Sequence, residues 1–163
     1  MPPIRKESRV LLVDVAAGPD LEEVRRLFLE YARSLPFSLD FQDFDRELAT
    51  LPGGYAPPGG RLLLARAGEE AAGCVALHAW DGEAGEIKRL YVRPAFRGRG
   101  IGRALATAIV AAGREAGYAR LILDTIDTMT EAMALYASLG FVPRVPYRPN
   151  PIPGAAFFEL SLR

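Results

Sequence analysis

The spacing of apolar residues in the first third of the chain predicts one strand and two helices. Branched apolar residues dominate residues 8–16, which is typical of a strand. Over residues 21–35 apolar residues return every three or four positions, which predicts a helix with one buried face and Asp20 as its N-cap. A shorter helix is expected over residues 41–51, where the proline and glycines of residues 52–54 end it.

The middle of the chain predicts three strands, over residues 61–67, 73–80 and 86–92. The turns between them are short, so the strands are expected to pair as an antiparallel meander. The period of the apolar positions then changes to that of a helix, which begins at Ile101 and is closed by Gly117.

The last third of the chain predicts a strand, a helix and two more strands. The apolar run at residues 121–125 is short and nearly continuous, which suits a central, buried strand. The motif Thr128-x-x-Glu131 is a capping box, so we expect a helix to open there and to end at Gly140. Strands are expected from Phe141 and over residues 155–162, with a proline-rich loop between them.

The order of elements is therefore β-α-α-β-β-β-α-β-α-β-β, which we expect to form one domain over residues 1–163. It belongs to the α/β (mixed α+β) class, with a central mixed, mostly antiparallel sheet flanked by helices on both faces. A chain of 163 residues is long enough to bury a continuous core without disulfides or metals.

Composition narrows the range of partners and compartments. The 20 Lys and Arg residues balance the 20 Asp and Glu residues, so neither nucleic acid nor an anionic membrane is expected as a main partner. The sequence has one cysteine, Cys74, no apolar run of membrane-spanning length and no signal-peptide pattern, so we expect a cytoplasmic protein. No His, Cys and Asp cluster has metal-ligand spacing, so no metal is expected.

The most informative segment lies between a predicted strand and a predicted helix and reads Arg97-Gly98-Arg99-Gly100-Ile101-Gly102-Arg103. Its alternating glycines let backbone N–H groups turn toward one point with no side chains in the way. The helix N-terminus adds a favourable field for an anion, and the arginines add donors for phosphate oxygens. The segment predicts a pyrophosphate site, although it has neither the Gly-Lys-Ser/Thr of a P-loop nor the Rossmann spacing.

Three motifs together carry a resemblance to a known family. Arg97-x-x-Gly100-x-Gly102 is similar to the Q/R-x-x-G-x-G/A motif of the GNAT acetyltransferases, which cradles the pyrophosphate of acetyl-CoA. Residues 86–94 resemble the family's fourth strand, and Ala132-x-x-Leu135-Tyr136-x-x-x-Gly140-Phe141 resembles its later helix and the strand that follows. The resemblance covers residues 61–143 closely. It implies the GNAT acyl-CoA N-acyltransferase fold, acetyl-CoA as co-substrate and N-acetyltransferase activity.

The resemblance also implies catalytic roles. An amine such as that of lysine has a pKa of about 10.4, so a carboxylate has to take its proton before it attacks; the family implies Glu86 for this role. The thioester carbonyl is expected to accept a hydrogen bond from the backbone N–H of Leu90, Tyr91 or Val92. Tyr136 is the candidate acid for the departing thiolate, and transfer is direct, without an acetyl-enzyme.

Several of these residues also have plainer interpretations. Glu86 is equally well explained as a rim carboxylate paired with Lys88 or Arg61, and Tyr136 is otherwise a core aromatic. His78 is the alternative base, but we expect it to be a half-buried, hydrogen-bonded histidine in a strand, without a catalytic role.

The opposite wall of the cofactor cleft contributes two more candidates. Asp124 is expected at the edge of the sheet beside the cofactor, with helix capping as its alternative role. Met129 stands where many relatives have an asparagine that contacts the pantetheine arm. Thr128 and Thr130 are the candidates to replace that amide contact.

The acceptor is expected to be a small amine or an amino acid, uncharged or zwitterionic. Its site is expected opposite the CoA arm, lined by Phe37, Phe41, Tyr147 and Asn150. Two alternatives stay open: a non-catalytic acyl-CoA-binding sensor, and acetylation of protein N-termini or lysines. The exposed apolar residues are explained equally well as the contact face of a homodimer. Homodimers are common in the family.

Overall fold

The computed structural model describes residues 9–40 and 43–163, and its elements follow the expected order. The elements are β1 (Val10–Asp14), α1 (Gly18–Ser34), α2 (Phe44–Thr50), the 3-10 turn η2 (Gly53–Tyr55), β2 (Arg61–Ala67), β3 (Glu70–Ala79), β4 (Ala84–Val92), η3 (Pro94–Phe96), α3 (Ile101–Glu115), β5 (Arg120–Ile126), α4 (Thr130–Ser138), β6 (Val142–Arg144) and β7 (Ala155–Ser161). None of the described helices is long and apolar enough to cross a membrane.

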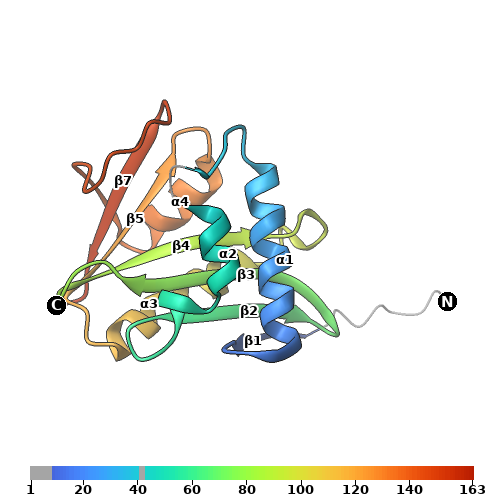
Figure 1. Cartoon of the computed structure of the whole chain (residues 1–163). Coiled ribbons are helices and arrows are strands. Elements are labelled where there is room, and N and C mark those ends of the chain that lie inside the picture. The colour runs from blue at the N-terminus through green and yellow to red at the C-terminus, as the bar shows by residue number, and fades with distance from the viewer. Residues whose placement is uncertain (1–8, 41–42) are drawn as a thin grey trace.

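All seven strands form one sheet, in the order β1-β2-β3-β4-β5-β7-β6. Strands β4 and β5 pair in parallel, and the other neighbours pair antiparallel. Helices α1 and α2 pack on one face of the sheet, and α3 and α4 pack on the other (Figure 1). The mixed, mostly antiparallel sheet with helices on both faces is therefore confirmed.

Two helix starts differ from the expected ones. Helix α1 begins at Gly18, so Asp20 lies inside its first turn, where it pairs with Arg66 instead of capping the helix. Helix α4 begins at Thr130 without a side-chain cap. A turn before α4, in which the backbone N–H of Met129 donates to the carbonyl of Ile126 (3.0 Å), moves the helix start past Thr128, so the capping box does not form.

Strand β4 carries a bulge that shapes the rest of the molecule. Two of its residues, Arg89 and Leu90, lie opposite the single residue Val75 of β3, and Arg89 has a positive φ of 62°. A bulge of this kind bends the strand and increases its twist. It also places the neighbouring side chains of Lys88 and Arg89 on the same face of the sheet, toward α1 and α2.

The parallel ladder between β4 and β5 is short. It joins Ala84–Glu86 of β4 to Arg120–Ile122 of β5, and no ladder pair between these strands follows among the described residues. Since β4 bends at its bulge while β5 continues straight along β7, the two strands separate toward their C-terminal ends.

A buried ion pair holds the bulge to helix α2. The guanidinium of Arg89, 4% exposed, donates two hydrogen bonds to the carboxylate of Glu47, at 2.9 and 3.0 Å. It also lies against the rings of Phe44 and Tyr31, 5.2 and 5.9 Å from their centres. The hydroxyl of Tyr55 donates to the same carboxylate (2.9 Å), so this pair ties α2 and η2 to the sheet.

We expect Glu47→Ala to lower the free energy of unfolding by about 3 kcal/mol, because it leaves the Arg89 guanidinium buried without a counter-charge. Equilibrium unfolding in urea measures the change. Glu22→Ala, which removes an exposed partner of Arg25, is the matched control and should cost at most about 0.5 kcal/mol. Equal losses in the two variants would contradict the structural role of the pair.

Candidate functional site

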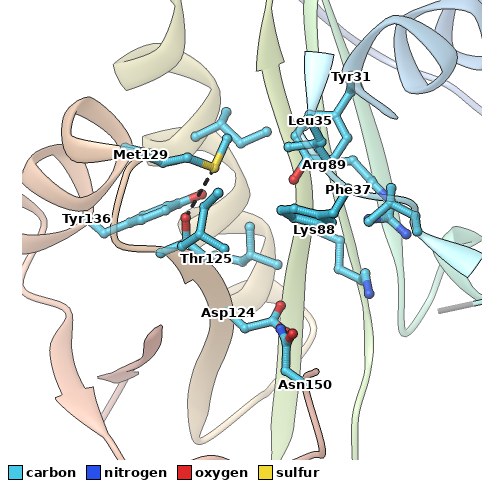
Figure 2. A pocket seen from close by; sticks show the side chains of 15 residues that line it. Tyr31, Leu35, Phe37, Lys88, Arg89, Asp124, Thr125, Met129, Tyr136 and Asn150 are labelled. Atoms are coloured by element: carbon cyan, nitrogen blue, oxygen red, sulfur yellow. Dashed lines mark hydrogen bonds between the residues drawn. The ribbon is translucent and has the colours of Figure 1, made fainter. Parts of the chain in front are cut away.

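The separation of β4 from β5 opens a cleft in the middle of the sheet, with a cavity of about 60 Å³ (Figure 2). It is lined by side chains from α1, β4, β5 and α4, from the loop that follows α1 and from the loop that precedes β7. The lining residues are Tyr31, Leu35, Phe37, Leu39, Ile87, Lys88, Arg89, Leu90, Asp124, Thr125, Ile126, Met129, Ala132, Tyr136 and Asn150. The cleft thus brings together six residues that sequence analysis singled out: Phe37, Leu90, Asp124, Met129, Tyr136 and Asn150.

Tyr136 lies on the α4 side of the cleft, beside Met129 and Thr125 (Figure 2). Its ring is 6% exposed and packs edge-on against Phe141, with 5.5 Å between the ring centres. Burial raises the pKa of Tyr136, and the nearby charge of Asp124 raises it further. The phenol therefore keeps its proton at neutral pH.

Met129 offers a thioether to the cleft. Its sulfur lies 3.5 Å from the hydroxyl oxygen of Thr125, which donates a weak hydrogen bond to it. Thr128 and Thr130, the candidates to replace an amide contact, are both exposed and are not among the cleft-lining residues.

A groove of about 210 Å³ runs along the turn at the start of α3. Leu90 and Ala132 line both this groove and the cleft, so the two spaces are neighbours. The turn depends on positive φ angles, 81° at Gly98 and 76° at Gly100, whereas a Cβ atom at either position would meet nothing within 4 Å. Glycine is therefore needed there for backbone conformation and not for space.

The start of α3 presents unused donors. The first hydrogen bond into the helix comes from the N–H of Ala104 to the carbonyl of Gly100 (3.0 Å). The N–H groups of Ile101, Gly102 and Arg103 consequently have no carbonyl partner within the helix, which is the usual arrangement of an anion site.

The three arginines of the turn are exposed and surround this helix start. Arg97 Nε donates to the carbonyl of Val92 (3.0 Å), and Arg103 donates to the hydroxyl of Ser138 (2.9 Å). Arg99 lies over the ring of Phe96, at 5.4 Å. Because each guanidinium has five N–H groups, all three keep donors for an anion.

Glu86 is fully buried in a polar network and is not among the residues lining the cleft. One carboxylate oxygen accepts from His78 Nε2 (2.6 Å), and the other accepts from the Tyr147 hydroxyl (2.6 Å) and from Arg148. Lys88 Nζ lies 3.9 Å away. Glu86 is therefore the centre of a network and not a rim carboxylate. Arg61, which we considered as its partner, pairs instead with Asp14 and Glu115.

This network borders a second, polar pocket of about 260 Å³ on the same face of the sheet. Its lining residues are Glu47, Thr50, Pro52, Gly53, Gly54, Tyr55, His78, Trp80, Glu86, Lys88 and Arg148. The Arg148 guanidinium lies 4.8 Å from the ring centre of Trp80 and 5.4 Å from that of Tyr147. Lys88 lines both pockets, so its side chain lies at their boundary.

The remaining candidates lie in different parts of the structure. Tyr91 is buried against α1, with its ring 6.1 Å from that of Tyr31, and Val92 lines the groove. Tyr147 contacts Glu86, away from the cleft. Asn150 reaches into the cleft, where its amide donates to Asp124 (3.2 Å; Figure 2). Phe41 lies outside the described residues.

Sequence reasoning missed Glu47, Arg89 as its partner, and Arg148. Arg148 is 62 residues from Glu86, and Glu47 is 42 residues from Arg89. The proline-rich loop and the short second helix carried no motif that pointed to either pair. The signal that the sequence offered for these pairs was a charged residue in each of the two segments.

Comparison with known proteins found a matching family, a related sequence and similar structures. The sequence model of a family described as acetyltransferase (GNAT) matches residues 21–141. An uncharacterized N-acetyltransferase from Schizosaccharomyces pombe is 39% identical over 159 residues, which cover 96% of this chain and 98% of the relative. A GNAT-family acetyltransferase from Staphylococcus aureus Mu50 has a similar fold, with a TM-score of 0.78 at 20% identity over 95% of this chain and 100% of its own. A GNAT-family acetyltransferase from Elizabethkingia anophelis, solved with acetyl-CoA bound, gives a TM-score of 0.67 at 23% identity over 94% and 98% of the two chains.

His78, the one histidine of the sequence, predicts how stability depends on pH. Burial, with the positive charges of Lys88 and Arg148, lowers the pKa of His78 from 6.5 to about 4. The unfolded chain therefore takes up a proton in this window that the folded chain does not, and the free energy of unfolding falls as the pH drops from 6.5 toward 4. We expect this residue to contribute about 2 kcal/mol of that fall.

His78→Gln keeps a donor for Glu86 but cannot titrate, so its stability should fall less steeply across the same window. Urea unfolding at several pH values measures both slopes. Identical slopes in the parent and the variant would show that His78 is not held neutral.

Proposed function

Because the chain belongs to the acetyltransferase (GNAT) family and is therefore an N-acetyltransferase, we propose that it transfers acetyl from acetyl-CoA to a primary amine of a small molecule or amino acid. The amine attacks the thioester directly, with both substrates bound. The observation that carries the proposal is that Leu90 and Ala132 line both the cleft and the groove at α3, so the Tyr136 phenol and a set of anion donors lie in neighbouring spaces, which would form one path. The relative from Elizabethkingia anophelis that binds acetyl-CoA supports this choice of acetyl donor.

The residues along the path fit acetyl-CoA, a substrate that supplies an activated thioester. The N–H groups at the start of α3 and the arginines at positions 97, 99 and 103 would hold the pyrophosphate. The edge of β4 has no ladder pairing with β5 beyond Glu86, so the backbone of Leu90, Tyr91 and Val92 would pair with the pantetheine arm and the thioester carbonyl. Met129 and Ala132 would pack against the same arm.

Tyr136 would give its proton to the departing thiolate. Its position in the cleft supports the role, and the phenol carries its proton at neutral pH, as an acid has to at the start of each turnover. The attacking amine has to lose a proton as well, and two carboxylates, Glu86 and Asp124, are near enough to the cleft to be considered for that task.

The acceptor would approach from the α1 side, past Tyr31, Leu35 and Phe37. The cavity is small and this wall is apolar, which favours a compact amine with an apolar body. The zero net charge of the chain provides no long-range attraction for a highly basic peptide. These features support a small molecule over a protein lysine as the acceptor.

Calorimetric titration tests the phosphate groove. We expect micromolar binding of acetyl-CoA and much weaker binding of acetylpantetheine, which lacks the pyrophosphate. Arg97→Ala and Arg103→Ala should each weaken acetyl-CoA binding about tenfold and leave acetylpantetheine unaffected. Arg114→Ala, at the far end of α3, is the control. Equal binding of the two donors would remove the pyrophosphate site.

Release of free CoA thiol in the presence of amino acids, polyamines, benzylamine and aniline tests the transfer itself. Tyr136→Phe should lower kcat about 100-fold with little change in acetyl-CoA affinity, because it removes the proton donor and keeps the ring. Tyr118→Phe, which removes a hydroxyl bonded to the carbonyl of Gly59, is the matched control and should keep kcat. Unchanged turnover in Tyr136→Phe would exclude Tyr136 as the acid, and absence of transfer to every amine would count against the proposed function.

A further inference from the structure

Two carboxylates flank the point where β4 and β5 separate, and their surroundings differ. Glu86 ends the parallel ladder on β4, opposite Ile122 of β5, and Asp124 lies two residues further along β5. Both side chains lie on the face of the sheet that α1 covers, as their contacts with Lys88 and Asn150 indicate. An ammonium ion in the cleft therefore has two candidate proton acceptors.

Both carboxylate oxygens of Glu86 already have hydrogen-bond partners. Its side chain is fully buried, and its two oxygens accept from an imidazole, a phenol and a guanidinium. Arg148 depends on this carboxylate, because Arg148 Nε is buried without a hydrogen-bond partner and the guanidinium needs a counter-charge. Protonation of Glu86 would remove that counter-charge and is therefore unfavourable, whereas a general base has to accept a proton.

Asp124 has the opposite surroundings. It is half-buried, lines the same cavity as Tyr136, and accepts a hydrogen bond from a neutral group, the Asn150 amide, at 3.2 Å. Figure 2 shows the two side chains in contact at one end of the cleft, with Tyr136 further along the same wall. Asp124 thus has a neutral amide as its hydrogen-bond partner and interacts with the charge of Lys88, whereas Glu86 is bonded directly to the guanidinium of Arg148.

The charge of Asp124 acts on the ionisable groups around the cleft. It raises the pKa of Tyr31 on α1, of Tyr136 on α4 and of Tyr147 in the loop before β7. It also opposes the fall in the pKa of Lys88 on β4, which burial lowers to about 8. Asp124 and Tyr136 line the same cleft, so the charge of the carboxylate affects how readily the phenol gives up its proton.

We propose that Asp124 accepts the proton of the acceptor ammonium ion, and that Glu86 is a positioning residue that holds Tyr147 and Arg148 against the sheet. This inference rests on the proposed acetyl transfer. An N–H bond of the ammonium breaks and its proton passes to an Asp124 oxygen; the nitrogen lone pair then forms the C–N bond to the thioester carbonyl carbon. As the C–S bond breaks, the thiolate takes the Tyr136 proton. The second proton lost by nitrogen restores the phenol, and Asp124 releases its proton to solvent.

The test compares two acceptors of similar shape that differ in basicity. Benzylamine is protonated at neutral pH and needs a base, whereas aniline is already neutral. Asp124→Asn should lower kcat/KM for benzylamine about 100-fold and for aniline less than about tenfold, with acetyl-CoA affinity unchanged. Asp45→Asn makes the same charge change at an exposed position on α2 and should alter neither value.

Glu86→Gln should behave differently. We expect a lower Tm and a higher KM for both amines, with the ratio of benzylamine to aniline activity unchanged, because the loop is loosened while the base remains. A selective loss of benzylamine activity in Glu86→Gln, or an equal loss of both activities in Asp124→Asn, would overturn the assignment.

If wild-type protein acetylates neither of these two amines, the same comparison uses the panel amine that it does acetylate, assayed at pH values below and above the pKa of that amine. Asp124→Asn should lower activity where the amine is protonated and leave it nearly unchanged where the amine is neutral. An equal loss at both pH values would overturn the proposal. Failure of the proposed function is recognised separately, since the wild-type protein would then transfer acetyl to no amine of the panel.

Discussion

The bulge of β4 and the ion pair that neutralises it are the constraint on which the rest of the structure depends. A positive φ at Arg89 turns the strand away from β5, and the same turn buries a guanidinium under α1 and α2. A buried guanidinium is tolerated only with a counter-charge, and Glu47 on α2 supplies it. The short second helix is therefore held in place by the distortion of the strand that opens the cleft. Removing one feature would disturb the others.

The opened cleft and the start of α3 serve complementary purposes because they expose different backbone groups. Along β4, the interrupted ladder leaves the edge of a strand facing the cleft. At α3, the first turn leaves N–H groups without carbonyl partners, and the helix dipole favours an anion there. A chain with no net charge thus has three exposed arginines around the start of α3 and a half-buried carboxylate, Asp124, in the cleft.

Buried charges on the α1 face connect segments that are remote in the sequence. Glu86 joins β3, β4 and the loop before β7 through His78, Tyr147 and Arg148. Buried polar networks of this kind are costly to break, so they restrict the positions of the loops that they join. This side of the cleft takes its shape from the same restriction, since Asn150 follows Arg148 by two residues and reaches Asp124.

Local sequence patterns by themselves determined the order of elements, the glycine turn at residues 97–103 and the position of Tyr136 on a helix. Each depends on interactions between residues close in the chain: the period of apolar positions, the conformational freedom of glycine, or the geometry of a helix start. Even local rules failed at Asp20 and Thr128, where a backbone turn or a distant partner competed with the cap.

Only the tertiary structure decided which charges meet. The motif that pointed to Glu86 gave no sign that its carboxylate is buried beneath Arg148, and nothing near Arg89 in the sequence pointed to Glu47. Asp124 and Asn150 are 26 residues apart and meet because β7 returns along β5. The strength of a charged group as an acid or base depends on burial and on partners from other elements. Those properties follow from topology and not from the local sequence.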